Sequence, residues 1–168
     1  DTRPIEVFGG YSYLRTLNGY DIDSHGWSTA IAFNFNDVLA LKADVGGQYA
    51  NYAVGNAKIK NSLHTFMFGP QINIRSHSRA TPFAHLLFGG ARDNTGVTIN
   101  SSSFNYGEGG FSFAMGAGID YKLNHSVSWR MFQVDYLLTR YRGPITSAVV
   151  PARHNISHVR VSSGLVIH

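Results

Sequence analysis

The sequence predicts an all-β fold, an eight-stranded antiparallel up-and-down transmembrane β-barrel. Three observations lead to this prediction: apolar residues alternate with a period of two, the alternating blocks are about ten residues long, and short and long connections take turns between them. A tilted strand needs about 9–11 residues to cross a membrane. Alternation is what a strand shows when its two faces meet different surroundings.

Eight blocks carry the alternation. They lie at residues 5–14, 27–35, 39–49, 64–75, 82–92, 111–122, 132–139 and 159–167. In the sixth block Phe111 and Phe113 share one face, and Ser112 and Ala114 share the other. The fifth block, PFAHLLFGGA, is nearly apolar on both faces. We assign its even-numbered residues (Ala84, Leu86, Phe88) to the outside and its odd-numbered residues (Phe83, His85, Leu87, Gly89) to the inside.

The connections alternate in length. Residues 36–37, 76–79 and 124–125 are tight and polar, as hairpin turns are. Between them lie long segments, at residues 16–26, 53–62, 93–109 and 143–155. Short periplasmic turns and long extracellular loops are typical of outer-membrane barrels. The even strand number then places both termini in the periplasm, and residues 1–168 form a single domain.

Two soluble folds also alternate. A lipocalin-like barrel keeps its apolar face inside and its polar face in water, and a β-sandwich needs apolar inner faces on both sheets. Here one face is large and apolar, while the other is small, polar and charged, which favours a membrane barrel with a polar interior.

Composition excludes several other classes. Charged residues make up 14% of the chain, below the roughly 25% of an ordinary soluble domain. The net charge of +4 is spread along the chain without a basic stripe, so we expect no nucleic-acid partner. Cysteine is absent, which rules out thiolate chemistry. The chain starts at Asp1 without an apolar leader, so we expect a mature outer-membrane chain whose signal peptide has been removed.

Several stretches then resemble a known family. VFGGYSYLR, FGPQINIRS, TPFAHLLFGGAR, FAMGAGIDYKL and FQVDYLLTRY are similar to the outer-membrane protein β-barrel family, the group around the OmpA transmembrane domain and OmpX. The resemblance covers nearly the whole chain and implies an eight-stranded membrane barrel. Such barrels usually end on an aromatic residue. Ile167 and Leu165 have the right parity, but the sequence stops at His168, one residue before the position where the aromatic would stand.

Inward positions carry a balanced set of charges. The predicted lumen network consists of four acids and four bases: Glu6, Asp44, Asp120, Asp135, Lys42, Lys122, Arg75 and Arg160. Enclosed charges must be paired, and an eight-stranded barrel is just wide enough to be filled by side chains. We therefore expect a lumen closed by ion pairs. A small or gated channel stays open as the alternative if those pairs can exchange partners.

Aromatic residues gather where strands end. We predict a girdle on the long-loop side from Tyr11, Tyr13, Trp27, Tyr49 and Phe66, and one on the short-turn side from Phe35, Tyr121 and Trp129. Ordinary β-propensity also enriches aromatic residues in strands. Placement at both rims favours the girdle, with outer-membrane lipids and lipopolysaccharide as the expected partners.

A catalytic site is the least favoured reading. Some small outer-membrane barrels remodel lipid A with a serine, a histidine and an acid, and the histidine and serine candidates here are His64, His85, His154, His158, Ser157 and Ser162. No recognisable pattern joins them. His154 and His158 do not converge on a strand as they would on a helix, so we expect no metal site, no cofactor and no enzyme. Residues 93–109 and 143–155 remain as candidate ligand-binding loops with an adhesion-like or structural role.

Overall fold

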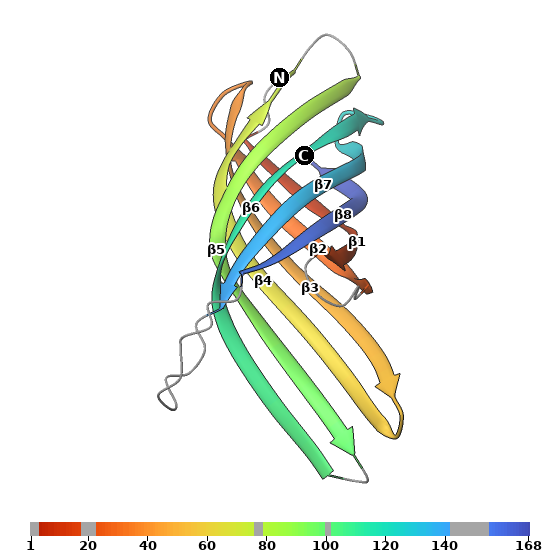
Figure 1. Cartoon of the computed structure of the whole chain (residues 1–168). Coiled ribbons are helices and arrows are strands. Elements are labelled where there is room, and N and C mark those ends of the chain that lie inside the picture. The colour runs from red at the N-terminus through yellow and green to blue at the C-terminus, as the bar shows by residue number, and fades with distance from the viewer. Residues whose placement is uncertain (1–3, 18–22, 76–78, 100–101, 142–154) are drawn as a thin grey trace.

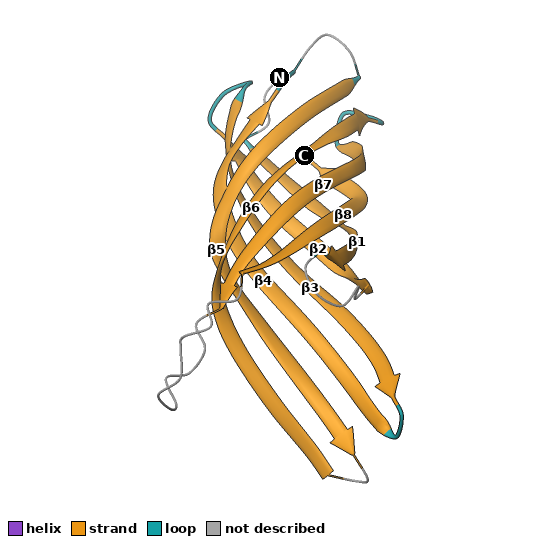
Figure 2. Ribbon diagram, viewed as in Figure 1, coloured by secondary structure: helices purple, strands orange, loops and turns teal. Residues whose placement is uncertain are grey.

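The described residues of the computed structural model form eight strands, whose arrangement Figures 1 and 2 show. It describes residues 4–17, 23–75, 79–99, 102–141 and 155–168 and, at positions 52, 54, 106, 108, 141 and 155, the backbone alone. The strands are β1 (Ile5–Thr16), β2 (Asp23–Asn34), β3 (Leu39–Val54), β4 (Ala57–Asn73), β5 (Ala80–Ile99), β6 (Ser102–Lys122), β7 (Val127–Tyr141) and β8 (Asn155–Ile167). No helix long and apolar enough to span a membrane occurs among the described residues.

The strands close into one antiparallel barrel. Each strand pairs with its neighbours in sequence, and β1 closes the ring with β8 through pairs such as Val7 with Ile167. The beginning of β1 and the end of β8 therefore lie at the same end of the barrel as the short β2–β3, β4–β5 and β6–β7 connections (Figure 1). The predicted fold class, an eight-stranded up-and-down barrel, is confirmed.

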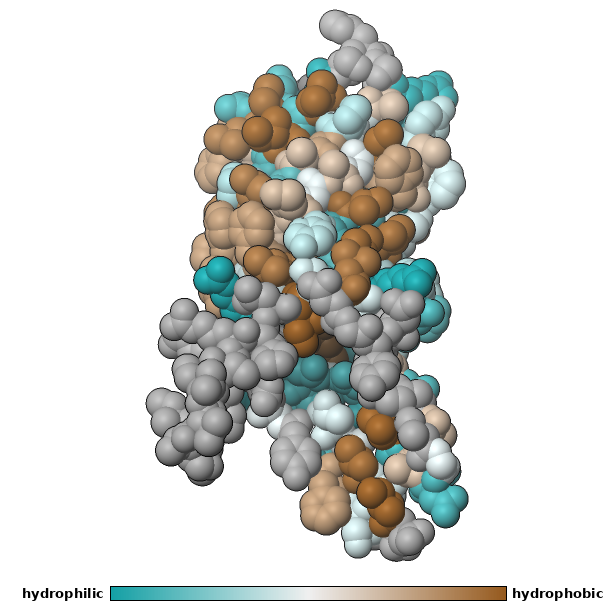
Figure 3. Space-filling model, in the orientation of Figure 1, coloured by the Kyte–Doolittle hydropathy of each residue, from teal (hydrophilic) through white to brown (hydrophobic). Residues whose placement is uncertain are grey.

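The two faces of the barrel wall have opposite chemistry. Large apolar side chains such as Phe68, Met115 and Val134 are exposed on the outside, whereas Lys42, Asp44 and many other polar residues are buried inside. Figure 3 shows apolar residues covering the barrel wall. A soluble barrel would have the reverse arrangement, and an apolar outer band is what a hydrocarbon environment requires.

The inside and outside assignment of the fifth block is correct. Phe83, His85 and Leu87 are buried in β5, and Leu86 and Phe88 are exposed. Each of these residues follows the two-residue period of the strand, although the composition of the block gives little contrast between its faces.

Two of the predicted long loops are strands instead. Residues 53–62 belong to a hairpin in which β3 and β4 pair up to Val54 and Ala57, so that two residues, Gly55 and Asn56, form the turn. Gly55 has a φ of 60°, which glycine adopts without steric cost. Residues 93–109 likewise pair along β5 and β6 as far as Ile99 with Ser102.

The other two long segments are partly strand. In the segment 16–26, β1 includes Thr16 and β2 begins at Asp23. In the segment 143–155, β8 begins at Asn155, and residues 143–154 lie outside the described part of the chain.

The long hairpins form a sheet that continues beyond the barrel. Strands β5 and β6 have 20 and 21 residues, against 12 each for β1 and β2. Pairing of β3 with β2 ends at Tyr49, and pairing of β6 with β7 begins at Gly110. Residues 50–62, 93–99 and 102–109 therefore make a four-stranded protruding sheet, which extends past the other strands in Figure 1.

Candidate functional site: a filled lumen and a protruding sheet

The centre of the lumen is an ion-pair network around Arg160. This side chain donates from Nε and Nη2 to Asp135 Oδ2, at 2.8 and 2.6 Å, and from Nη1 to Asp44 Oδ1 at 2.9 Å. Lys42 Nζ lies 4.0 Å from Asp44 Oδ2 and donates to Gln133 Oε1 at 3.1 Å. All five side chains are at most 3% exposed, so their polar atoms depend on one another rather than on bulk water.

A second ion pair joins Arg130 to Asp120. The Arg130 guanidinium donates to both oxygens of the carboxylate, at 2.7 and 2.8 Å, in the bidentate geometry that arginine favours. It also lies between two aromatic rings, 4.5 Å from the centre of Phe8 and 4.2 Å from that of Phe83. Its third hydrogen bond goes to Gln133, which links this pair to the Arg160 network.

Arg130 was missed because a β-bulge changes the parity of β7. The register shifts between Arg130 and Gln133, and both Met131 and Phe132 are exposed on the lipid side. Counting backward by two from Phe132 puts Arg130 outside, whereas it is buried inside. The sequence contained a signal: with Trp129 and Phe132 both assigned outward, an odd and an even position could share one face only across a bulge.

The other predicted network residues lie nearer the short-turn rim. Arg75 donates to Glu6 Oε1 at 2.6 Å, and Asn34 donates to the same oxygen at 2.9 Å. Lys122 is a correction: it pairs with Ser128 at the end of β6, but its side chain is exposed and has no ion pair with the described residues.

Apolar side chains fill the rest of the interior. Met67, Leu87, Ala114 and Leu137 form one buried cluster. Glycine provides space for the larger groups: a Cβ on Gly116 would overlap the Asp135 carboxylate and come within 2.8 Å of His85 Nε2. A void bordered by Glu6, Lys42 and Arg130 has about 10 Å³, which is less than a water-lined path would need. Side chains therefore close the described lumen at the level of this void.

The histidine and serine residues considered for a catalytic site contact different partners in different parts of the barrel. His85 Nε2 lies 2.9 Å from Asp135 Oδ1 inside the lumen, and Ser162 donates to Ser12 on the inner wall. His158 Nδ1 contacts the Thr16 hydroxyl at 3.1 Å, while Ser157 accepts a hydrogen bond from Tyr136. No serine, histidine and acid are brought together among these contacts. His154 lies outside the described residues, and no group of three metal-ligating side chains occurs in the part of the chain described.

The structure gives the strand pairing and the exposure of the predicted girdle residues, whose place at the two rims of a membrane wall stays a prediction. On the long-loop side, Tyr11 is paired with Trp27, the Tyr13 hydroxyl donates to Asp23 at 2.6 Å, and Tyr49 and Phe66 are exposed. On the short-turn side, Tyr121 pairs with Trp129, and Phe35 is exposed just after β2. The Tyr11 hydroxyl group also forms a hydrogen bond with His25 Nδ1.

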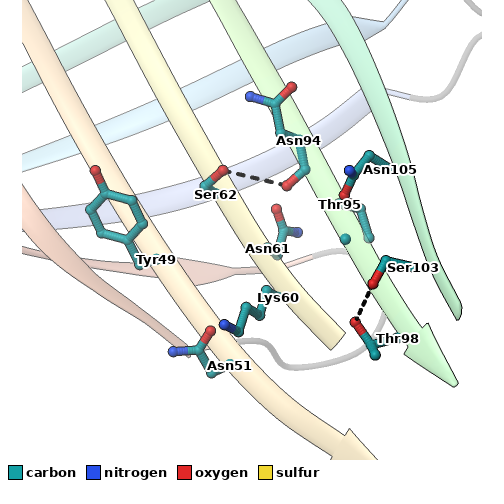
Figure 4. A pocket seen from close by; sticks show the side chains of 11 residues that line it. Tyr49, Asn51, Lys60, Asn61, Ser62, Asn94, Thr95, Thr98, Ser103 and Asn105 are labelled. Carbon is teal, nitrogen blue, oxygen red and sulfur yellow. Dashed lines mark hydrogen bonds between the residues drawn. The ribbon is translucent and has the colours of Figure 1, made fainter. Parts of the chain in front are cut away.

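The protruding sheet has an apolar face and a polar face. The register places Ile59, Val97 and Phe104 in line on the face that continues the inner wall of the barrel. The opposite face continues the outer wall and carries three ordered rows of side chains. These rows are Tyr49–Ser62–Asn94–Gly107, Asn51–Lys60–Gly96–Asn105 and Ala53–Lys58–Thr98–Ser103. They border a hollow of about 700 Å³ (Figure 4).

Comparisons with known proteins give structural matches. No protein-family model matches the sequence, and no curated protein matches it. Neisserial surface protein A superposes with a TM-score of 0.69 at 11% identity, over 98% of this chain and 97% of the other. Ail, the attachment invasion locus protein of Yersinia pestis, gives 0.63 at 14% over 98% and 99%. OprG from Pseudomonas aeruginosa gives 0.55 at 14% over 97% and 94%.

At these identities the comparisons establish the fold, which agrees with the apolar outer band and the polar lumen described above. The match extends over almost the full length of each chain. The chain therefore has the fold of the eight-stranded outer-membrane β-barrels.

Proposed function

We propose that this protein is a surface-recognition barrel, in which the membrane-embedded part is a closed support and the protruding sheet contacts a protein partner. The observation that carries the proposal is the open edge of β6. Between Ser102 and Gly109 this strand pairs with β5 on one side and has no neighbour on the other side among the described residues. Unpaired backbone groups on such an edge can accept an additional strand.

The side chains beside this edge favour an extended peptide segment as the ligand. Phe104 is 54% exposed and Ile99 45% exposed, on a part of the sheet that stands beyond the girdle. Exposed apolar groups outside the membrane mark contact surfaces. The edge from Ser102 to Gly109 contains no lysine or proline, and Glu108 is its one charged residue; lysine, other charges and proline are what usually protects natural edges.

The filled lumen supports recognition over transport. Arg160 connects β8 to β3 and β7, so a large and fully buried side chain is held from two sides. Conduction would require these buried contacts to break, each at a considerable cost in free energy. Proteins named for attachment and for the cell surface share this fold, which is therefore compatible with such a role.

The test uses the protein refolded into lipid nanodiscs and a peptide array of random sequence. We expect retained peptides to alternate apolar and polar residues, and we expect retention to be lost when residues 96–105 are replaced by a two-residue turn. The control variant replaces residues 53–58 in the same way and keeps the β6 edge. Equal retention by all three proteins would overturn the proposal, and discrete current steps in a planar bilayer would favour the channel instead.

A further inference from the structure

We propose that the hollow on the outer face of the protruding sheet binds the phosphorylated saccharide headgroup of an outer-leaflet glycolipid. This surface includes the side chains of Ser103 and Asn105 on β6, but it is a face of the sheet, whereas the β6 edge offers backbone groups. Figure 4 shows the side chains that border the hollow, and the strand register places those of the three rows on the side of the sheet that continues the outer wall. Asn61 and Thr95, which also border the hollow, belong to the opposite face by register. The ligand would therefore be a neighbour of the barrel in the same membrane.

The position of the hollow along the strands indicates the level in the bilayer at which its ligand would lie. Tyr49 borders the hollow and is also one of the residues predicted for the girdle on the long-loop side. Its ring packs edge-on against His64, with ring centres 5.8 Å apart, and Phe66 follows two residues further toward the membrane centre. Aromatic girdles mark the headgroup level of the bilayer. The hollow begins at that level, where a lipid headgroup lies and its acyl chains can remain beside the apolar wall.

The side chains of the hollow suit a sugar. Amide and hydroxyl groups from Asn51, Ser62, Asn94 and Asn105 lie in two neighbouring rows, and each offers both a donor and an acceptor or can rotate to do so. Sugar hydroxyls require the same mixture of donors and acceptors. Tyr49 adds an aromatic side chain that is 44% exposed at the membrane end of the rows.

The charges of the same face suit phosphate. Lys60 borders the hollow, and Lys58 lies on the next row outward. His64 pairs with Arg92 on the row nearer the membrane. None of the outward positions in the three rows is an aspartate or a glutamate, and Asp93 falls on the opposite face. A carboxylate-free surface with several cations attracts anionic headgroups.

Glycine shapes the hollow. Gly96 lies in the middle row between Lys60 and Asn105, so two long polar side chains flank a position that has none. A Cβ there would come within 3.2 Å of Asn105 Oδ1. The missing side chain leaves the floor open between the cationic and the amide groups.

The experiment measures binding of purified lipopolysaccharide to the protein in phosphatidylcholine nanodiscs, with phosphatidylglycerol as an anionic lipid that has no sugar chain. We expect Lys60→Glu to weaken lipopolysaccharide binding about tenfold or more, because it places a carboxylate beside the phosphate. Asn105→Leu should weaken binding of lipopolysaccharide and leave phosphatidylglycerol unaffected. Lys122→Glu, the same charge change at the opposite rim, should change neither.

Three results would overturn the proposal. They are unchanged lipopolysaccharide affinity in folded Lys60→Glu, equal loss in Lys122→Glu, and equally tight binding of phosphatidylglycerol by the parental protein. Folding of each variant is checked by its heat-dependent gel mobility, and Lys60 is exposed, so its substitution leaves the barrel wall intact. Peptide retention on the array is a separate measurement that does not depend on these results. A failure of lipopolysaccharide binding is therefore distinguishable from a failure of the proposed function.

Discussion

Arg160 donates two hydrogen bonds to a single carboxylate oxygen of Asp135, at 2.8 and 2.6 Å. The two residues face each other on neighbouring strands, β8 and β7. The same guanidinium reaches Asp44 on β3, which is not a neighbour of β8 in the ring. One side chain thus connects opposite parts of the barrel wall, and the lumen is a structural core made of charges.

Replacing Arg160 by methionine should destabilise the barrel by roughly 3–5 kcal/mol, because it leaves two buried carboxylates with Lys42 as their remaining fixed cation. Urea unfolding in detergent, followed by tryptophan fluorescence, measures the change. Lys122→Met serves as the control, since Lys122 is exposed at the rim. If the two variants unfold at the same urea concentration, the network does not contribute to stability as described.

Arg130→Lys should cost about 1.5–3 kcal/mol although it conserves the charge. A lysine cannot form the bidentate pair with Asp120, and it lacks the planar group that lies between Phe8 and Phe83. The matched change, Arg75→Lys, affects a single hydrogen bond to Glu6 at a partly exposed site and should cost less than about 1 kcal/mol. Comparable losses in the two variants would contradict this account of Arg130.

The barrel interior shows how far odd and even positions along a strand predict which side chains face inward, and where that prediction fails. Strand alternation was enough to place Lys42, Asp44, Asp135 and Arg160 in the lumen, because a two-residue period admits no other arrangement while the strand is regular. Arg130 escaped because one extra residue in β7 reverses the count. A bulge leaves the composition of a strand unchanged, so it appears in a sequence only as a conflict between neighbouring assignments.

The protruding sheet was missed for a different reason. Residues 93–109 are rich in asparagine, serine, threonine and glycine, which is the composition of a solvated loop. Outside the membrane a strand needs no lipid-facing apolar residues, so the contrast that marks the barrel strands disappears. What remains is the weaker alternation of Val97, Ile99 and Phe104, and long-range pairing with β4 decides the structure.

Gly116→Ala should lower stability by about 1–3 kcal/mol or reduce the yield of folded barrel, because the new methyl group would meet Asp135 and His85 in a filled interior. Gly9→Ala provides the comparison. That glycine is on the same barrel, and an added Cβ would have no neighbour within 4 Å. The folded fraction is read from gel mobility of unheated samples. Equal yields of the two variants would mean that the lumen around Asp135 has free space.

The boundary between the membrane-embedded wall and the protruding sheet can be tested with one kind of substitution at two sites. Met115 is 48% exposed on the outer wall of β6, between its register partners Leu86 and Tyr136. Met115→Arg should destabilise the barrel in lipid by about 2–4 kcal/mol, the cost of an arginine facing the hydrocarbon.

Phe104, on the same strand, is 54% exposed but lies in the protruding sheet. Phe104→Arg should leave the unfolding free energy nearly unchanged, because water surrounds the new charge. Unfolding in phospholipid vesicles compares the two variants with the parental protein. A large loss of unfolding free energy in Phe104→Arg would place that part of β6 inside the bilayer. An unchanged unfolding free energy in Met115→Arg would show that the wall around Met115 does not face the hydrocarbon. The two outcomes together locate the height at which β6 leaves the membrane.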